Sequence, residues 1–168
     1  MKRRAFLKIL GGGCVVAAGA GVVGYAHVNR FPDKAIEPWA RAGSAYSEPR
    51  LKALSYAILA PNPHNRQPWL VDLAVDGQVT LKVDQERLLP ETDPFNRQIT
   101  IGLGCFLEVL RMAAAEDGLR ADIDVFPEGY LTDALDDRPV AVVRFAEDNL
   151  AKPDPLFAHI LERRSLKE

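Results

Sequence analysis

The sequence predicts an α+β fold in which helices cover one sheet. The predicted elements occur in the order helix, hairpin, long helix, two strands and helix, and 168 residues suit a single domain. Because 48% of the residues are hydrophobic and 26% are charged, the chain has the composition of a folded protein. This composition excludes wholesale disorder and collagen-like or coiled-coil repeats.

The first 29 residues differ in charge from the rest of the chain. Four basic residues lie before position 9, and no acidic residue precedes Asp33. Without those four, 17 basic residues remain against 23 acidic ones, a net charge of about −6. A body this acidic is not expected to bind nucleic acid, which needs clustered basic side chains.

The same segment reads as an export signal, with a basic start and an uncharged stretch rich in Gly, Ala and Val. Residues 2–8 (Lys-Arg-Arg-Ala-Phe-Leu-Lys) resemble the twin-arginine signal, with Lys2 in place of the usual Ser or Thr. The resemblance implies the Tat translocase as a partner and a periplasmic protein, or one anchored to the outer face of the cytoplasmic membrane. Cleavage after Ala26 and retention of residues 1–29 as an anchor helix both stay open.

Residues 30–46 contain Pro32, Pro38 and Gly43 and are predicted to be a linker before a domain over 47–150. Ser47 is predicted to cap a helix that ends before Pro61. Residues 69–75 and 78–84 then flank Asp76-Gly77, which predicts a hairpin with a two-residue turn.

The second half of the domain starts with a long helix that Asp93-Pro94 opens and that runs to about Asp117, with Gly118 after it. Strands are expected near 121–126 and 139–146. A last helix is expected to begin at about Pro155.

Residues 60–69 (Ala-Pro-Asn-Pro-His-Asn-Arg-Gln-Pro-Trp) form the most informative segment. The prolines stiffen a loop that carries three amide side chains, Asn62, Asn65 and Gln67. Such amides either read the edge of a flat heterocycle or satisfy the loop's own backbone. Composition alone favours the second interpretation.

This segment resembles the flavin loop of the nitroreductase family, approximately Ala-Pro-Ser-x-x-Asn-x-Gln-Pro-Trp, with Asn62 where Ser is usual. The resemblance covers roughly residues 47–168 and implies a nitroreductase-like mixed sheet. It also implies FMN as the cofactor, with Asn62, Asn65 and Gln67 against its isoalloxazine ring. The implied activity is electron transfer from a donor such as NAD(P)H to a small-molecule acceptor, for example a nitroaromatic or a quinone.

The end of the chain, residues 163–167 (Arg-Arg-Ser-Leu-Lys), resembles the Arg-x-Ser-x-Arg/Lys string with which the family binds the FMN phosphate. The resemblance assigns Arg163, Ser165 and Lys167, with Arg164 beside them, to the cofactor site. Guanidinium, hydroxyl and ammonium donors suit a phosphate dianion. The alternative is a solvated basic helix end favoured by the helix dipole.

Asp93-Pro94-x-x-Arg97 and Gly102-x-Gly104 look like a stretch of an exported branch built from two nitroreductase-like halves. The order of flavin loop and phosphate string suits that branch, so residues 151–168 are expected to begin a second half or to bind phosphate. FMN binding would then need a homodimer or a missing C-terminal half. Gly102 and Gly104 either let the helix approach another backbone across such an interface or only allow close packing of the helix on the sheet. Arg97 either belongs to this motif or is only a surface cation.

No catalytic residue is assigned, and no metal site is expected, since Cys14 and Cys105 lack zinc-ligand spacing. Cys105 is expected to be a small buried hydrophobe, and His64 to take part in the loop's hydrogen bonding. The alternative to a flavin oxidoreductase is a non-catalytic, nitroreductase-like binding or partner module tethered outside the cytoplasmic membrane.

Overall fold

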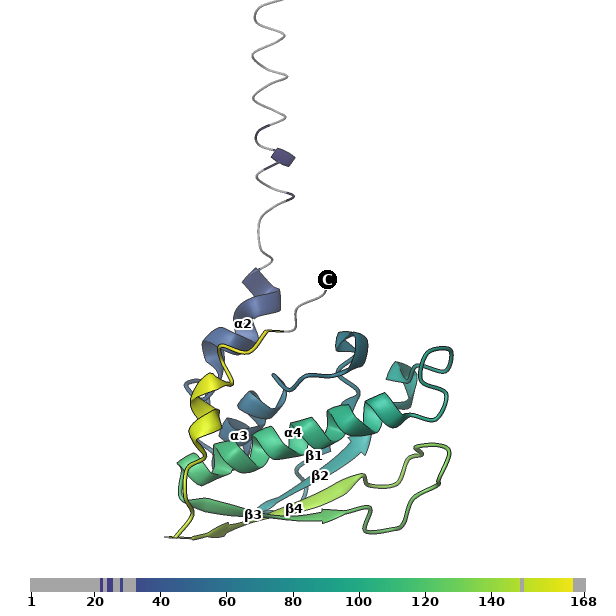
Figure 1. Cartoon of the computed structure of the whole chain (residues 1–168). Coiled ribbons are helices and arrows are strands. Elements are labelled where there is room, and N and C mark those ends of the chain that lie inside the picture. Colours follow the sequence, from purple (N-terminus) through teal and green to yellow (C-terminus); the bar gives the residue numbers. More distant parts are fainter. Residues whose placement is uncertain (1–21, 23, 26–27, 29–32, 149, 165–168) are drawn as a thin grey trace, which may run out of the picture. The chain divides into compact units, whose positions relative to one another are not determined.

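The computed structural model describes residues 22, 24–25, 28, 33–148 and 150–164 (Figure 1). The chain divides into two compact units, residues 1–36 and 37–168. In the first unit, Val22, Gly24, Tyr25 and Val28 are helical and exposed. The twin-arginine motif at residues 2–8 lies outside the described residues.

The second unit has the predicted α+β class, with a four-stranded sheet in the order β1-β2-β4-β3. Every pairing among the described strands is antiparallel, whereas the family resemblance implies a mixed sheet. The helices are α2 (Asp33–Arg41), α3 (Pro49–Ala57) and α4 (Arg97–Glu116), and the 3₁₀ helices are η1 (Pro63–Asn65), η2 (Gln85–Arg87) and η3 (Pro155–His159). The strands are β1 (Trp69–Asp72), β2 (Gln78–Val83), β3 (Leu119–Val125) and β4 (Ala141–Glu147).

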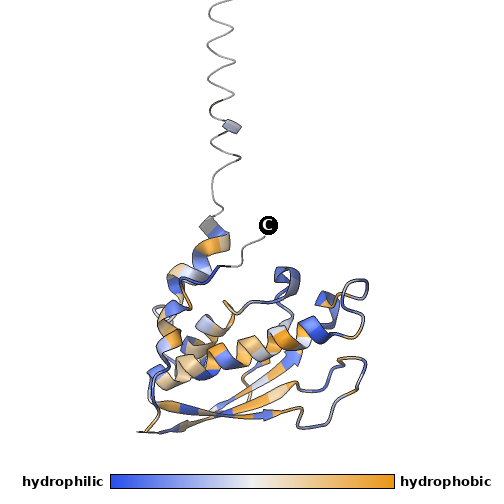
Figure 2. Cartoon of the chain, viewed as in Figure 1, coloured by the Kyte–Doolittle hydropathy of each residue, from blue (hydrophilic) through white to orange (hydrophobic). Residues whose placement is uncertain are grey.

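Helix α4 lies across one face of the sheet, with α3 beside it (Figure 1). Burial alternates along β2, so that Val79, Leu81 and Val83 face the core, as the sequence predicts. Figure 2 shows apolar residues along α4 interrupted by polar ones. α4 is also long and apolar enough to cross a membrane, but eleven of its residues are buried against the rest of the fold, as in the core helix of a globular domain.

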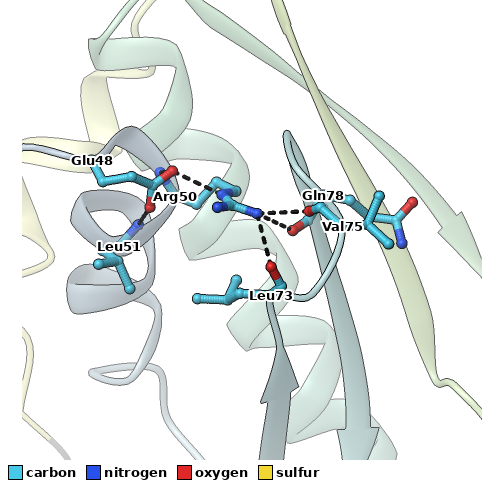
Figure 3. A network of polar contacts seen from close by, with 6 residues as sticks. All are labelled: Glu48, Arg50, Leu51, Leu73, Val75 and Gln78. Atoms are coloured by element: carbon cyan, nitrogen blue, oxygen red, sulfur yellow. Dashed lines mark hydrogen bonds and ion pairs between the residues drawn. The ribbon is translucent and has the colours of Figure 1, made fainter.

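The hairpin between β1 and β2 forms in the predicted place, but its connection spans residues 73–77 rather than two residues. Arg50 at the start of α3 holds this loop. Its Nη1 donates to the carbonyls of Leu73, Val75 and Gln78 at 3.4, 2.7 and 3.0 Å (Figure 3). One guanidinium therefore binds three carbonyls around the loop, of which that of Val75 also accepts from the backbone N–H of Gln78 at 3.2 Å.

The structure differs from the prediction in the residue that caps α3 and in the position at which α4 begins. Glu48, not Ser47, caps α3 by accepting from the backbone N–H groups of Arg50 and Leu51. α4 begins at Arg97, four residues after the predicted start, and the buried Asp93 carboxylate accepts from the N–H groups of Arg97 and Ile99.

Two predictions of local structure need correction. The expected linker, 30–46, contains α2, with Pro38 inside the helix, where it supplies no N–H for an intrahelical hydrogen bond. The expected last helix is the short 3₁₀ helix η3, capped by Asp154, whose carboxylate accepts from the N–H of Leu156. η3 packs through Phe157, whose ring centroid lies 4.8 Å from that of Tyr56.

Candidate functional site

The flavin-like loop leaves α3 and enters β1 through a backbone that is unusual for its residue types. His64, Asn65 and Gln67 have φ values of 50, 52 and 49°, in the left-handed region that favours glycine. Pro63 and the buried Pro68 flank this stretch and limit its freedom. Strained residues of this kind persist where the surroundings determine them, and they are frequent at ligand sites.

Asn62 uses its amide to hold the loop closed. Its Oδ1 accepts from the backbone N–H of Gln67 at 2.7 Å, and its Nδ2 donates to the carbonyl of Ala60 at 3.2 Å. The sequence leaves open whether this amide contacts a ligand or satisfies the loop's own backbone. In the structure the Asn62 amide satisfies the backbone.

The amides of Asn65 and Gln67 make no hydrogen bonds within the described part of the chain. Asn65 is exposed and Gln67 is half-buried. His64 is exposed, and its ring likewise has no hydrogen bond to a described residue, so the expected part in the loop's hydrogen bonding is not seen. These side chains are thus available to a ligand, whereas that of Asn62 is engaged.

The C-terminal arginines lie against the start of this loop. The Nη2 of Arg163 donates to the carbonyl of Leu59 at 2.8 Å, a contact that joins residues 104 positions apart. The guanidinium of Arg164 donates to the carbonyls of Leu161 and Arg163 and lies 5.8 Å from the ring centroid of Trp39. Ser165 and Lys167 lie outside the described residues.

The two segments meet in one pocket of about 270 Å³. Its walls are Trp39, Ala60, Pro61, Asn62, His64, Asn65, Arg163 and Arg164. No carboxylate is among these lining residues, so the two guanidiniums make the pocket attractive to an anion. Of the predicted site residues that the structure describes, only Gln67 is not in this wall.

Trp39 is the wall residue that sequence reasoning misses, because it lies in the segment predicted to be a linker. Its indole Nε1 is buried and has no hydrogen-bond partner among the described residues. A buried indole N–H normally has one, so this donor is a place where a ligand acceptor would fit. The large aromatic side chain within a segment predicted to be a linker is the signal that could have found it.

These residues fit FMN in their chemistry but only in part by size. Guanidiniums suit the phosphate, while an indole face and free amides suit a flat ring. Pockets for small molecules and cofactors measure about 300–1,000 Å³. A volume of about 270 Å³ therefore suits one end of the cofactor rather than the whole molecule.

A second hollow, of about 340 Å³, lies on the α4 side of the same loop, where Asn62 and Pro63 face Gly102 and Cys105. A Cβ added at Gly102 would lie 3.2 Å from Asn62 Cβ and from Pro63 Cδ, so this glycine serves close packing, against the loop rather than the sheet. Gly104 has nothing within 4 Å of such a Cβ. Cys105 is half-buried rather than buried.

In the part of the chain that the structure describes, no group of three His, Cys, Asp or Glu residues is placed to hold a metal ion.

At the start of α3, the helix that leads into the flavin-like loop, the pKa of Glu48 lies below its usual value. Burial of this carboxyl raises the pKa, but hydrogen bonds from Arg50 and from the N–H of Leu51 outweigh the burial.

Comparison with known proteins finds no matching family model. Two strains of Mycobacterium tuberculosis carry a similar protein named "Putative NAD(P)H nitroreductase acg", which is 39% identical over 75 residues. That match covers 45% of this chain and 22% of the relative. A second M. tuberculosis protein, "Uncharacterized protein Rv3127", is 30% identical over 129 residues, or 66% of this chain and 37% of the relative.

The chain thus spans well under half the length of the curated relatives that it matches. The two segments that resemble nitroreductase motifs, the loop at 60–69 and the arginines at 163–164, meet in one pocket. Over part of its length, this chain is similar to a protein named as a nitroreductase, and the similarity supports the resemblance to that family.

Proposed function

We propose that this chain forms part of an exported flavin oxidoreductase of nitroreductase type, with FMN as its cofactor. One observation carries the proposal: Asn62 and Asn65, from the flavin-like loop, line the same pocket as Arg163 and Arg164, from the phosphate-like string. The partial similarity to a mycobacterial protein named as an NAD(P)H nitroreductase supports it. Because the match covers 22% of that relative, the activity of the whole protein is itself part of the proposal.

In this proposal the arginines bind the anionic end of the cofactor. Arg163 is held by the carbonyl of Leu59 and Arg164 by that of Leu161, so both guanidiniums are already ordered before an anion arrives. Ordered donors lose less conformational entropy on binding than free ones. Ser165 and Lys167 would add a hydroxyl and a further positive charge.

In this proposal the flavin-like loop, residues 60–69, binds and orients the rest of the cofactor. Asn65 presents an amide without a partner among the described residues, and Trp39 presents an aromatic face and a buried N–H that needs an acceptor. Asn62 keeps the loop closed through its bonds to Gln67 and Ala60 and acts by positioning its neighbours. A second wall, from another copy or from further protein, would cover the part of the cofactor that 270 Å³ does not enclose.

When bound, FMN would supply the redox chemistry, namely acceptance of a hydride from a donor such as NAD(P)H and electron transfer to an electron-poor acceptor such as a nitroaromatic or quinone. The protein's own contribution is to hold the ring, exclude water and balance the phosphate charge.

The test is a fluorescence titration of the full chain with FMN and with riboflavin, which has the same ring without the phosphate. FMN is expected to bind at least about tenfold more tightly at low salt, since charge-assisted contacts to phosphate are worth about 1.5–3 kcal/mol. Arg164→Gln should reduce that preference for FMN over riboflavin. Asn65→Ala should weaken the binding of FMN by roughly 1–3 kcal/mol. Arg144→Gln, on the exposed face of β4, is the matched control.

A non-catalytic binding or partner module is the second candidate. It is favoured by the engaged amide of Asn62 and by a pocket smaller than a whole flavin nucleotide needs. Binding of neither flavin would support this candidate over the oxidoreductase. Equal binding of FMN and riboflavin, unchanged in Arg164→Gln, would remove the phosphate-binding role of the C-terminal arginines.

A further inference from the structure

A larger pocket lies where the start of α4 faces the connection between β3 and β4, and it shares Ile101 with the 340 Å³ hollow beside the flavin-like loop. It measures about 450 Å³ and is lined by Phe95, Arg97, Thr100, Ile101, Phe126, Tyr130, Leu131, Thr132, Ala134 and Leu135. The volume is within the range of about 300–1,000 Å³ that binds small organic molecules. None of these residues lines the 270 Å³ pocket, so the two sites are separate.

The walls of this pocket are apolar side chains that remain exposed to water. Phe95 is 51% exposed, Ile101 67%, Tyr130 65% and Leu131 53%. Four large apolar side chains exposed around one hollow form the kind of patch that marks a ligand or partner site. Phe126 and Tyr130 add an aromatic pair with ring centroids 5.3 Å apart.

The connection that forms one wall has a fixed backbone at its start. Phe126 has φ of 50°, which is rare for a bulky residue. Its backbone N–H donates to the carbonyl of Val140 at 2.9 Å, and its carbonyl accepts from the N–H of Gly129 at 2.8 Å. These bonds hold the backbone of Phe126 in a strained conformation, and Phe126 forms part of the pocket wall.

Arg97 is the one ionisable side chain with a full charge at neutral pH among the residues that line this pocket. Its guanidinium carbon lies 5.2 Å from the ring centroid of Phe95, and no ion pair joins it to a described carboxylate. The nearest acid in sequence, Asp93, is buried and already accepts from two backbone N–H groups. An apolar hollow with one uncompensated cation is complementary to a molecule with an apolar body and a single negative charge.

We propose that this pocket binds a small aromatic carboxylate. Its ring system would lie among Ile101, Phe126 and Tyr130, and its carboxylate would pair with the guanidinium of Arg97, whose planar fork matches a carboxylate in two parallel hydrogen bonds. The hydroxyl of Thr132 supplies a further donor in the wall, whereas Thr100 already donates to the carbonyl of Asn96 at 2.7 Å. The site is independent of the flavin proposal.

The test is a fluorescence titration of the full chain with 2-naphthoate and with 2-naphthalenemethanol, its uncharged analogue. We expect the carboxylate to bind about threefold to fivefold more tightly at low salt and less so at high salt, because Arg97 is exposed and an ion pair at the surface is weak and screened by salt. Arg97→Gln should abolish that preference and leave binding of the alcohol unchanged. Ile101→Ser, at a position 67% exposed, should weaken both probes without a change in the circular dichroism spectrum.

Two control variants locate the binding. Arg144→Gln removes an exposed arginine from the face of β4 and should preserve the preference for the carboxylate. Arg164→Gln tests the other pocket: if it removes the preference and Arg97→Gln does not, the carboxylate binds beside Trp39 and the proposal is overturned. Equal binding of both probes to the unmodified chain would also overturn it, as would a dimer that buries the pocket and binds neither probe.

Discussion

A Cβ added at Gly102 in α4 would lie 3.2 Å from the Cβ of Asn62, closer than nine in ten real Cβ contacts. The backbone of the long helix therefore packs closely against Asn62 and Pro63 of the flavin-like loop at this point. Asn62 in turn accepts from the N–H of Gln67, so the position of the helix helps to set the shape of the loop.

This contact predicts opposite results for two glycines of the same helix. Gly104→Ala should stabilise the fold by about 0.5–1 kcal/mol, because alanine favours the helix and its Cβ meets nothing within 4 Å. Gly102→Ala should be less stable than Gly104→Ala by about 1 kcal/mol or more, because its Cβ must displace Asn62 and Pro63. Urea unfolding of the two variants measures the difference, and equal stabilities would contradict the close packing.

Arg50 predicts a second effect on stability. Arg50→Met keeps most of the side chain's apolar length and removes the donors to Leu73, Val75 and Gln78 (Figure 3). We expect a loss of about 1–3 kcal/mol in the free energy of unfolding, the usual range for hydrogen bonds to a charged group. Arg120→Met is the control, because Arg120 pairs with Asp122 on the exposed surface and should change stability by less than about 0.5 kcal/mol. Equal losses in the two variants would contradict a special role for Arg50.

Glu48 predicts how stability depends on pH. Burial opposes ionisation of this carboxyl, but the hydrogen bonds from Arg50 and Leu51 dominate and lower its pKa below the ordinary 4.5. A group with a depressed pKa in the folded state stabilises the fold fully above its unfolded pKa and loses that contribution as pH falls through its folded pKa. The stability difference between the unmodified chain and Glu48→Gln should therefore be constant near neutral pH and should shrink below about pH 4.5. Chemical denaturation across this range measures it, and a difference that does not change with pH would refute the assignment.

Export is the fourth prediction. A fusion of residues 1–35 to a folded reporter should reach the periplasm in a Tat-dependent way, because residues 2–8 resemble the twin-arginine motif. Changing Arg3 and Arg4 to Lys should stop export while preserving the charge of the segment. If the Lys variant is exported as well as the original, residues 1–29 are a signal or an anchor of another type.

The sequence predicts the elements with strong periodicity and misses the features that depend on long side chains or distant contacts. Val79, Leu81 and Val83 alternate clearly, and their burial follows from that pattern. The wide hairpin loop depends instead on Arg50, a residue more than 20 positions away, which no turn rule contains. Similarly, Glu48 caps α3 because its longer carboxylate reaches two N–H groups beside Arg50, a contact that a preference for Ser at the cap does not anticipate.

The candidate site shows the same division. The amides at 62, 65 and 67 are visible as a motif, but only the folded structure shows that Asn62 is engaged and that Asn65 has no hydrogen-bond partner among the described residues. Trp39 enters the pocket wall from a segment whose Pro and Gly content predicts a linker. Local composition cannot reveal a wall that forms when residues 39 and 164 come together in the folded chain.

The bond between Arg163 and the carbonyl of Leu59 closes a loop of about a hundred residues, and its consequence is a coupled equilibrium. The 270 Å³ pocket needs the segment that carries Arg163 and Arg164 in place, and this segment follows the short 3₁₀ helix η3, where Leu156 is exposed to water while Phe157 packs on Tyr56. Segments with few buried apolar contacts open at a lower free energy than the core. Only molecules in which this segment is in place can bind a ligand in the pocket, so the apparent affinity is the intrinsic affinity multiplied by the fraction of such molecules. A bound ligand should in turn raise that fraction and slow amide hydrogen exchange between residues 154 and 164.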